Sequence, residues 1–110
     1  MRYKLPNRNY QRGRSYEYKE KKRWEEMGYI VLRSSGSHSI FDLVAVPLLG
    51  QEDTVLIQVK SGRSKPSFKS DENLRTLRDT IFSQNVQKNI VWYKRVKGKR
   101  KVERIEQWIN

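Results

Sequence analysis

A chain of 110 residues is long enough for one compact hydrophobic core but not for two, so a single domain is expected. It contains no cysteine, which excludes a disulfide framework and a thiolate zinc site. Its 24 Lys and Arg residues exceed its 12 Asp and Glu residues, and the net charge of +12 predicts an anionic partner, above all nucleic acid, whose phosphates bind dispersed positive charge through counterion release.

The N-terminal stretch lacks the apolar centre of a secretory signal, and no apolar segment approaches the roughly 18 residues that a membrane-spanning helix requires. These features predict an intracellular, cytoplasmic protein that associates with DNA and not with a membrane. Residues 1–14 carry several Arg and Lys residues, no acid and no hydrophobic periodicity. They predict a flexible basic arm that precedes a single domain at residues 15–110.

The first helix is expected between Ser15 and Gly28. A serine hydroxyl can accept a hydrogen bond from an unpaired amide of a first turn, and glycine commonly follows a last turn. Tyr16, Trp24 and Met27 fall roughly on one face of this segment, opposite its Lys and Glu residues. This pattern predicts a helix of about three turns with one buried face.

The strands are expected where short apolar runs are bounded by Gly, Ser, Pro or charged residues. These runs lie at residues 29–34, 40–46, 54–60 and 89–95, and a short fifth strand is expected at residues 101–105. A second helix, capped by Ser70 or Asp71, separates the third strand from the fourth. The order predicts an α/β fold with a mixed central sheet flanked by helices, in which the hairpins are antiparallel and the helical crossover is parallel.

The second helix gathers apolar residues on one face, at Leu74, Leu77, Ile81 and Phe82. This face is expected either to pack onto the sheet or to join two copies of the chain. The loop before it, residues 61–69, is rich in Ser, Gly, Pro and basic residues. Such a loop is expected to be exposed and able to approach a phosphate backbone.

Hard oxygen ligands and a cation occur together on the second and third strands. Asp42 lies early in one strand, and Gln58 and Lys60 are two residues apart on the next, so Gln58 and Lys60 point to the same face. If the strands pair, the Asp42 carboxylate, the Gln58 side-chain oxygen and the Val59 carbonyl can surround one Mg²⁺ or Mn²⁺ ion. Glu17 can complete this shell directly or through water, and Lys60 would lie beside a scissile phosphate.

The order and spacing of these pieces resemble the archaeal Holliday-junction resolvases and related viral nucleases. The resemblance covers roughly residues 12–62 and rests on the stretches Gly13 to Glu17, Arg33 to Ser37 with Gly36, Asp42 to Ala45, and Ile57 to Lys60. It implies a restriction-endonuclease-like PD-(D/E)XK fold, a homodimer with two active sites, and Mg²⁺- or Mn²⁺-dependent cleavage of branched DNA, four-way junctions in particular. A metal is the only cofactor expected.

The resemblance also implies a role for each site residue. Glu17 and Asp42 would be metal-associated acids, Ser37 would assist at the active site, Lys60 would position water or stabilise charge on the phosphate, and Arg33 would contact DNA. The departure is Gln58, where most members of the class have an acid. A neutral amide keeps an oxygen ligand but removes one negative charge, which lowers metal affinity.

Other interpretations of these residues stay open. Glu17 can be a solvated helix residue paired with Lys21 at the i, i+4 spacing. Ser37 can serve only the turn, and the single histidine, His38, is expected to be a loop residue. Trp24 and Trp92 are expected in the core, whereas the position of Trp108 is open. The chain can also be a nucleic-acid-binding module that has lost catalysis, or a nuclease for another DNA structure.

Basic residues gather in three segments that can form a phosphate-binding surface. These segments are the N-terminal arm, the loop at residues 61–69, and the stretch from Lys94 to Arg104. The alternative for the last of them is a solvated edge that lysines protect from aggregation. The residues expected to contact DNA are Arg12, Arg14, Arg33, Arg63, Lys65, Lys69, Lys97, Lys99 and Arg100.

Overall fold

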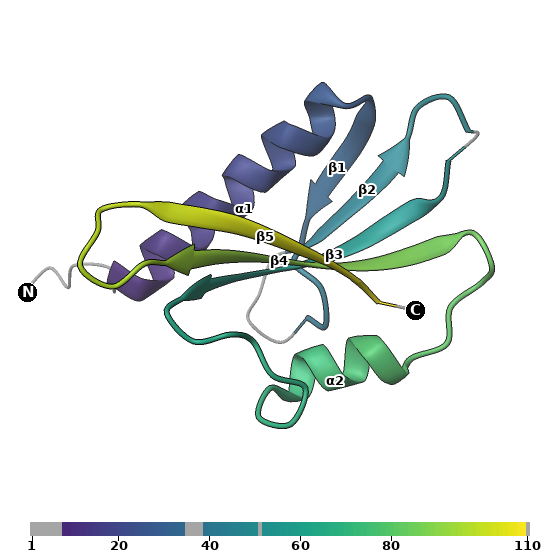
Figure 1. Cartoon of the computed structure of the whole chain (residues 1–110). Coiled ribbons are helices and arrows are strands. Elements are labelled where there is room, and N and C mark those ends of the chain that lie inside the picture. The colour runs from purple at the N-terminus through teal and green to yellow at the C-terminus, as the bar shows by residue number, and fades with distance from the viewer. Residues whose placement is uncertain (1–7, 35–38, 51, 110) are drawn as a thin grey trace, which may run out of the picture.

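The computed structural model describes residues 8–34, 39–50 and 52–109, with side chains from Gly13 onward. In these ranges the chain is a mixed α/β fold in which two helices flank a five-stranded sheet (Figure 1). The elements are α1 (Arg8–Glu26), β1 (Tyr29–Arg33), β2 (Leu43–Pro47), β3 (Thr54–Gly62), α2 (Glu72–Asp79), β4 (Val86–Arg95) and β5 (Val102–Ile109). The predicted order of helices and strands is confirmed.

The strands lie in the sheet in their order along the chain, from β1 to β5. Neighbouring strands are antiparallel except for β3 and β4, which are parallel and joined by the crossover through α2. This is the arrangement predicted for the hairpins and the crossover. Strands β3 and β4 run side by side beyond the end of β1 and the beginning of β2, so that one half of the sheet projects past the other (Figure 1).

Several boundaries differ from those predicted. α1 begins at Arg8, so residues 8–14 of the expected arm are helical. β2 begins at Leu43 and not at Ile40, and β5 continues to Ile109. Gly28 follows α1 with a φ of 97°, a left-handed conformation that glycine adopts without steric cost, as expected for a glycine that ends a helix.

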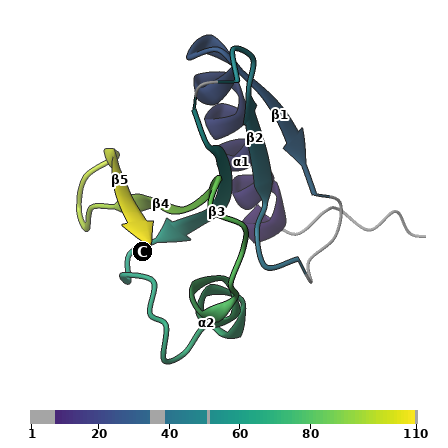
Figure 2. The ribbon, with the colours of Figure 1, turned by 90° about the vertical axis from the view of Figure 1, so that its right-hand side faces the viewer.

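Each helix covers one face of the sheet with its own apolar cluster. On the α1 face, Trp24 packs with Val55 and Ile57, whereas Leu74 of α2 packs with Leu56 and with neighbouring residues of the opposite face. The alternation of faces along β3 follows from the two-residue period of a strand. Figure 2 shows α1 beside β1 and β2, with α2 well separated from it.

The apolar face of α2 packs onto the chain's own sheet. Leu74 and Leu77 are fully buried there. The helix ends at Asp79, so Ile81 lies outside it and is 95% exposed. The prediction that Ile81 continues this face is wrong, because α2 ends two residues before Ile81. This face is therefore not available to join two copies.

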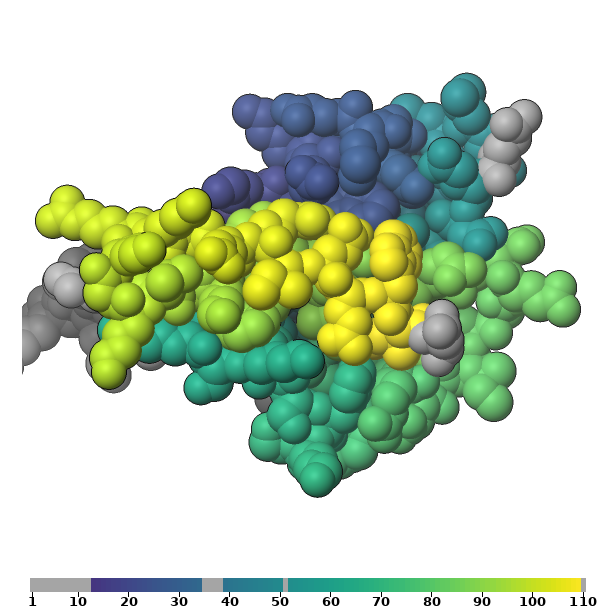
Figure 3. Space-filling view, in the orientation of Figure 1, coloured from purple at the N-terminus to yellow at the C-terminus, as the bar shows by residue number. Residues whose placement is uncertain are grey.

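The prediction that Trp24 and Trp92 lie in the core is confirmed. Trp24 and Trp92 are buried, and Trp108 is half exposed with its ring edge against that of Trp24. The yellow β5 crosses the front of the molecule in Figure 3. No helix in the described ranges is long and apolar enough to cross a membrane.

A buried carboxylate ties α1 to the far edge of the sheet. Glu20 is fully buried, and its oxygens accept hydrogen bonds from Trp24 Nε1 at 3.0 Å and from the Tyr93 hydroxyl at 2.6 Å. Arg104 of β5 donates to both oxygens, at 2.5 and 3.2 Å. Burial acts to raise the pKa of Glu20, but the hydrogen bonds from Arg104 and Tyr93 outweigh it and the pKa is lowered.

Candidate active site

Asp42 lies where β2 begins and fastens the chain to β3. Its N–H donates to the Ile57 carbonyl, and its Oδ2 accepts from the Val59 N–H, both at 2.8 Å. The ladder between β2 and β3 starts with the pair Leu43 and Ile57, so β3 continues past the beginning of β2. The Asp42 carboxylate thus takes the place of a backbone acceptor on the open edge of β3.

Two further oxygens belong to the same stretch of β3. The N–H and C=O of a strand residue point to the same edge, so the Val59 carbonyl faces the edge on which the Asp42 carboxylate lies. Gln58 is 3% exposed, and its Oε1 is buried without a hydrogen-bond partner among the residues that the structure describes. Leaving a buried acceptor unpaired costs about 1–3 kcal/mol. An oxygen of this kind is suited to a bound cation or water.

Lys60 follows Gln58 by two residues and extends from the same face of β3. Its Nζ lies 2.6 Å from Oδ2 of Asp71, the residue that caps α2. Burial acts to raise the pKa of Asp71, but the hydrogen bond from Lys60 and those from the helix amides outweigh it and lower the pKa. The ammonium is therefore held between the site and the start of α2.

Glu17 of α1 faces this region from the other side. Its Oε1 lies 3.4 Å from Arg33 Nε, and both side chains are largely buried. Burial raises the pKa of Glu17, and the negative charge of Asp42 raises it further. The alternative pairing of Glu17 with Lys21 is wrong, because Lys21 pairs with Glu25 at 3.1 Å.

The pKa of Asp42 is also raised. Burial is the largest cause, and the hydrogen bond from Val59 and the charges of Lys60 and Arg33 counteract it only in part. Two acids with raised pKa values in one place are typical of a site that a cation would stabilise. The fold therefore places Glu17, Asp42 and Lys60 in one electrostatic environment.

These oxygens are of the type that binds a hard divalent cation, but they carry little negative charge. Carboxylate, amide and backbone carbonyl oxygens are the ligands that Mg²⁺ and Mn²⁺ accept. Asp42, Gln58 Oε1, the Val59 carbonyl and Glu17 are the groups that would hold the ion. Within residues 13–34, 39–50 and 52–109, however, no three Asp, Glu or His residues are grouped so that they could hold a metal. The amide at Gln58 accounts for the missing third acid.

Some of the predicted site residues lie outside the residues that the structure describes, and the partner of Lys60 was not predicted. Gly36, Ser37 and His38 lie outside the described residues, as does the side chain of Arg12. Asp71 was expected only as a helix cap. Its pairing with Lys60 had no signal in the sequence, because it depends on how the crossover folds back onto β3.

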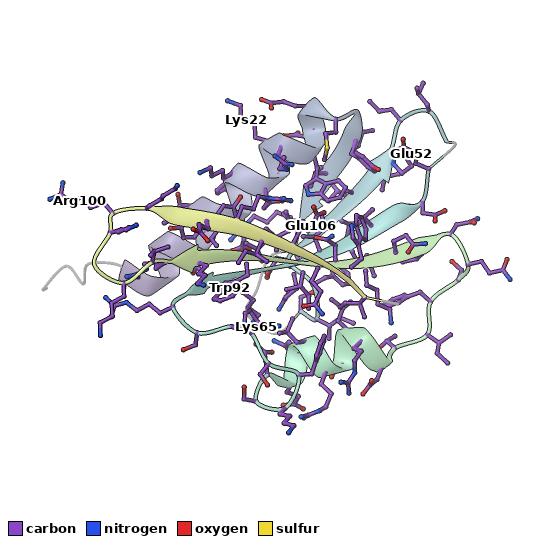
Figure 4. All side chains as sticks on the ribbon, in the orientation of Figure 1. Lys22, Glu52, Lys65, Trp92, Arg100 and Glu106 are labelled. Carbon is purple, nitrogen blue, oxygen red and sulfur yellow. The ribbon has the colours of Figure 1, made fainter. Side chains whose placement is uncertain are left out.

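The residues expected to contact DNA divide into three groups. Arg33 is turned inward toward Glu17, and Arg14 is exposed and donates to the Tyr18 hydroxyl at 3.3 Å. The other groups are exposed and lie on the loop after β3 and on the turn between β4 and β5: Arg63, Lys65, Lys69, Lys97, Lys99 and Arg100. Figure 4 shows Arg100 pointing away from the body at the tip of this turn, and Lys65 on the loop side below β4.

Comparison with protein-family models gives no match for this sequence. No curated protein matches it either. What the chain does is therefore inferred from its own residues and from the geometry described above.

Proposed function

We propose that the chain is a metal-dependent DNA endonuclease with the restriction-endonuclease-like PD-(D/E)XK fold, and that it cleaves four-way DNA junctions by phosphodiester hydrolysis. The observation that carries the proposal is the convergence of Asp42, Gln58 and Lys60 at the open edge of β3, where Gln58 Oε1 is buried with no hydrogen-bond partner in the described part of the chain. The five-stranded mixed sheet and the net charge of +12 support it.

Each residue has a distinct task in this proposal. Asp42, Gln58 and the Val59 carbonyl hold the cation, with Glu17 directly or through water. When bound, Mg²⁺ or Mn²⁺ would polarise the phosphate and lower the pKa of an attacking water. Lys60 stabilises the negative charge that develops on the phosphate oxygens during attack. The exposed basic loop and turn hold the phosphate backbone without selecting a base sequence.

The proposal is tested with a labelled four-way junction beside duplex and flap controls, in Mg²⁺ or Mn²⁺ at low salt. Symmetric nicks in the junction are expected, and metal chelation should abolish them. Cleavage of flaps or duplex alone would keep the nuclease but replace its substrate. Intact DNA in every case would refute the nuclease.

A second candidate is a DNA-binding module on the same fold that has lost catalysis. One observation favours it: position 58 carries a neutral amide in place of the acid that would complete a metal site. Binding of DNA without cleavage would select this candidate.

Replacing Gln58 by Glu separates the two candidates. The new carboxylate would restore the third acid, so we expect metal affinity to rise about tenfold or more, which corresponds to about 1.4 kcal/mol. Without metal it would crowd Asp42 and Glu17 in a buried place, and the melting temperature should fall. Thermal unfolding with and without Mn²⁺, together with junction cleavage, measures both effects.

The matched control for this variant is Gln107→Glu, which adds the same charge at an exposed position of β5. It should change neither the metal response nor the cleavage. If Mn²⁺ raises the melting temperature of Gln58→Glu no more than that of the control, position 58 does not contact the metal.

The turn between β4 and β5 is expected to contribute to DNA affinity. Each phosphate contact changes the slope of log K against log salt by about 0.9, so the double variant Lys99→Gln, Arg100→Gln should flatten the slope by about 2. The control Lys22→Gln, Arg23→Gln removes the same charge from α1, away from that turn (Figure 4). Equal slopes for the two double variants would exclude a specific role for the turn. Fluorescence anisotropy over a salt series provides the measurement.

The proposal includes a homodimer with two active sites, as the sequence resemblance implies. The apolar face of α2 cannot supply its interface, because Leu74 and Leu77 are fully buried within one chain. Paired nicks at symmetric positions would require the dimer, and light scattering of the purified protein measures its mass.

A further inference from the structure

Asp71 uses its two carboxylate oxygens for different tasks. Oδ1 accepts from the Leu74 N–H at 3.1 Å and caps α2, while Oδ2 lies 2.6 Å from Lys60 Nζ. Both side chains of the ion pair are 27% exposed. One carboxylate therefore joins the start of the crossover helix to the lysine of the candidate site.

This ion pair closes the basic loop at its base. Lys60 and Asp71 stand at the two ends of residues 61–70, the segment that carries Arg63, Lys65 and Lys69. Asp71 also donates its N–H to the Ser67 carbonyl at 3.0 Å, which fixes the end of the loop. A displacement of the loop would therefore move the partner of Lys60.

The ammonium of Lys60 also needs such a partner. A lysine side chain has a flexible four-carbon stem and carries about 2 kcal/mol of rotamer entropy, which a reaction site must overcome to keep the charge in one place. Asp42 and Asp71 both interact electrostatically with this region: the charge of Lys60 acts to lower the pKa of Asp42, and the charge of Asp71 acts to raise it. Lys60 thus lies in the field of two carboxylates, those of Asp42 and Asp71.

We propose that Asp71 is a positioning residue, which holds the Lys60 ammonium where a DNA phosphate would react and couples its position to the basic loop. The inference rests on the proposed nuclease function. Asp71 acts through Lys60 and through the N-terminus of α2, and does not itself touch the substrate.

The variant Asp71→Asn tests this role. Asparagine is as good a helix cap as aspartate, so α2 keeps its first turn, but the amide removes the charge that pairs with Lys60. We expect kcat for junction cleavage to fall by about 10- to 100-fold, as for a reacting group that is slightly misplaced, while KM and the melting temperature stay unchanged. The matched control is Asp79→Asn, which removes an exposed acid from the end of the same helix.

A second measurement does not require nuclease activity. Acetylation of each lysine by a water-soluble reagent, followed by mass spectrometry, should show Lys60 protected relative to Lys65 in the wild type. The protection should disappear in Asp71→Asn and persist in Asp79→Asn. An equal rate at Lys60 in all three proteins would overturn the inference, because the ion pair would then not hold the ammonium.

The outcomes separate this inference from the function on which it rests. Wild-type protein that cleaves no DNA would overturn the proposed nuclease, and the inferred role with it. An active wild type with Asp71→Asn as fast as Asp79→Asn would overturn the positioning role alone. A melting temperature that falls in Asp71→Asn in proportion to the lost activity would also overturn it, since the residue would then serve only the helix.

Discussion

Replacing Asp42 by Asn is expected to lower the rate of junction cleavage by about 10²- to 10³-fold, the effect of removing one preorganised charged group from an active site. The asparagine oxygen can still accept from the Val59 N–H, so the local backbone should not move. Burial raises the pKa of Asp42, which means that its charge is poorly stabilised in the absence of metal. The variant should therefore be as stable as the wild type or more stable.

This combination of lost activity and retained stability is the signature of a functional residue. Single-turnover cleavage and thermal unfolding, measured on the same preparations, provide the test. The matched control is Asp53→Asn at the beginning of β3, an acid that pairs with Gln87 at 2.8 Å. If Asp42→Asn cleaves as fast as this control, Asp42 is not part of the active site.

Replacing Arg104 by Met is expected to produce the largest loss of stability, about 3 kcal/mol or more, because it leaves the buried Glu20 carboxylate without its cationic partner. The Tyr93 and Trp24 hydrogen bonds remain but carry no compensating charge. Urea unfolding followed by tryptophan fluorescence measures the change. The control Arg100→Met, in the exposed turn, should change stability by less than about 0.5 kcal/mol.

The double variant Glu20→Gln, Arg104→Met tests the cause. If the loss comes from the unpaired charge, removing that charge should restore much of the stability. A double variant less stable than Arg104→Met would contradict this explanation and indicate that packing of the arginine stem is the main contribution.

The same pair predicts how stability depends on pH. The pKa of Glu20 is lowered from its ordinary value of 4.5, so the folded state binds the proton less tightly than the unfolded state does. The contribution of the pair is therefore present above about pH 4.5 and is lost as the pH falls through the lowered pKa of the folded state. In Arg104→Met, only the hydrogen bonds from Tyr93 and Trp24 oppose the effect of burial on Glu20, so its pKa should rise and the acid-induced loss of stability should shrink.

Much of the fold could be predicted from the sequence, because the strands are short apolar runs between clear turn residues. The least predictable feature was Glu20. It lies between Tyr16 and Trp24 on the buried face of α1, whereas the sequence pattern predicts that the glutamates of this helix lie on its polar face. Its partner Arg104 is separated from it by most of the chain, and such pairs depend on tertiary structure that local periodicity does not encode.

The candidate site divides in the same way. Strand alternation was sufficient to place Gln58 and Lys60 on one face. The hydrogen bond from the Val59 N–H to the Asp42 carboxylate was not predicted, because it depends on how β2 pairs with β3. The pairing of Asp71 with Lys60 could not be predicted in this way, because it depends on the path of the chain between β3 and α2. The start of α1 was also missed, because residues 8–14 lack the apolar spacing that marks a helix.

The open edge of β3 has a consequence for solubility. A strand that extends past its neighbour exposes backbone groups that can recruit a strand from another molecule, which is a common route to aggregation. Here the Val59 N–H already donates to the carboxylate of Asp42. Two positive charges come next along the chain, Lys60 within β3 and Arg63 directly after it. Asp42 and Lys60, which are proposed to act in catalysis, are therefore also expected to discourage edge-to-edge association of two molecules along the part of β3 that β2 does not cover.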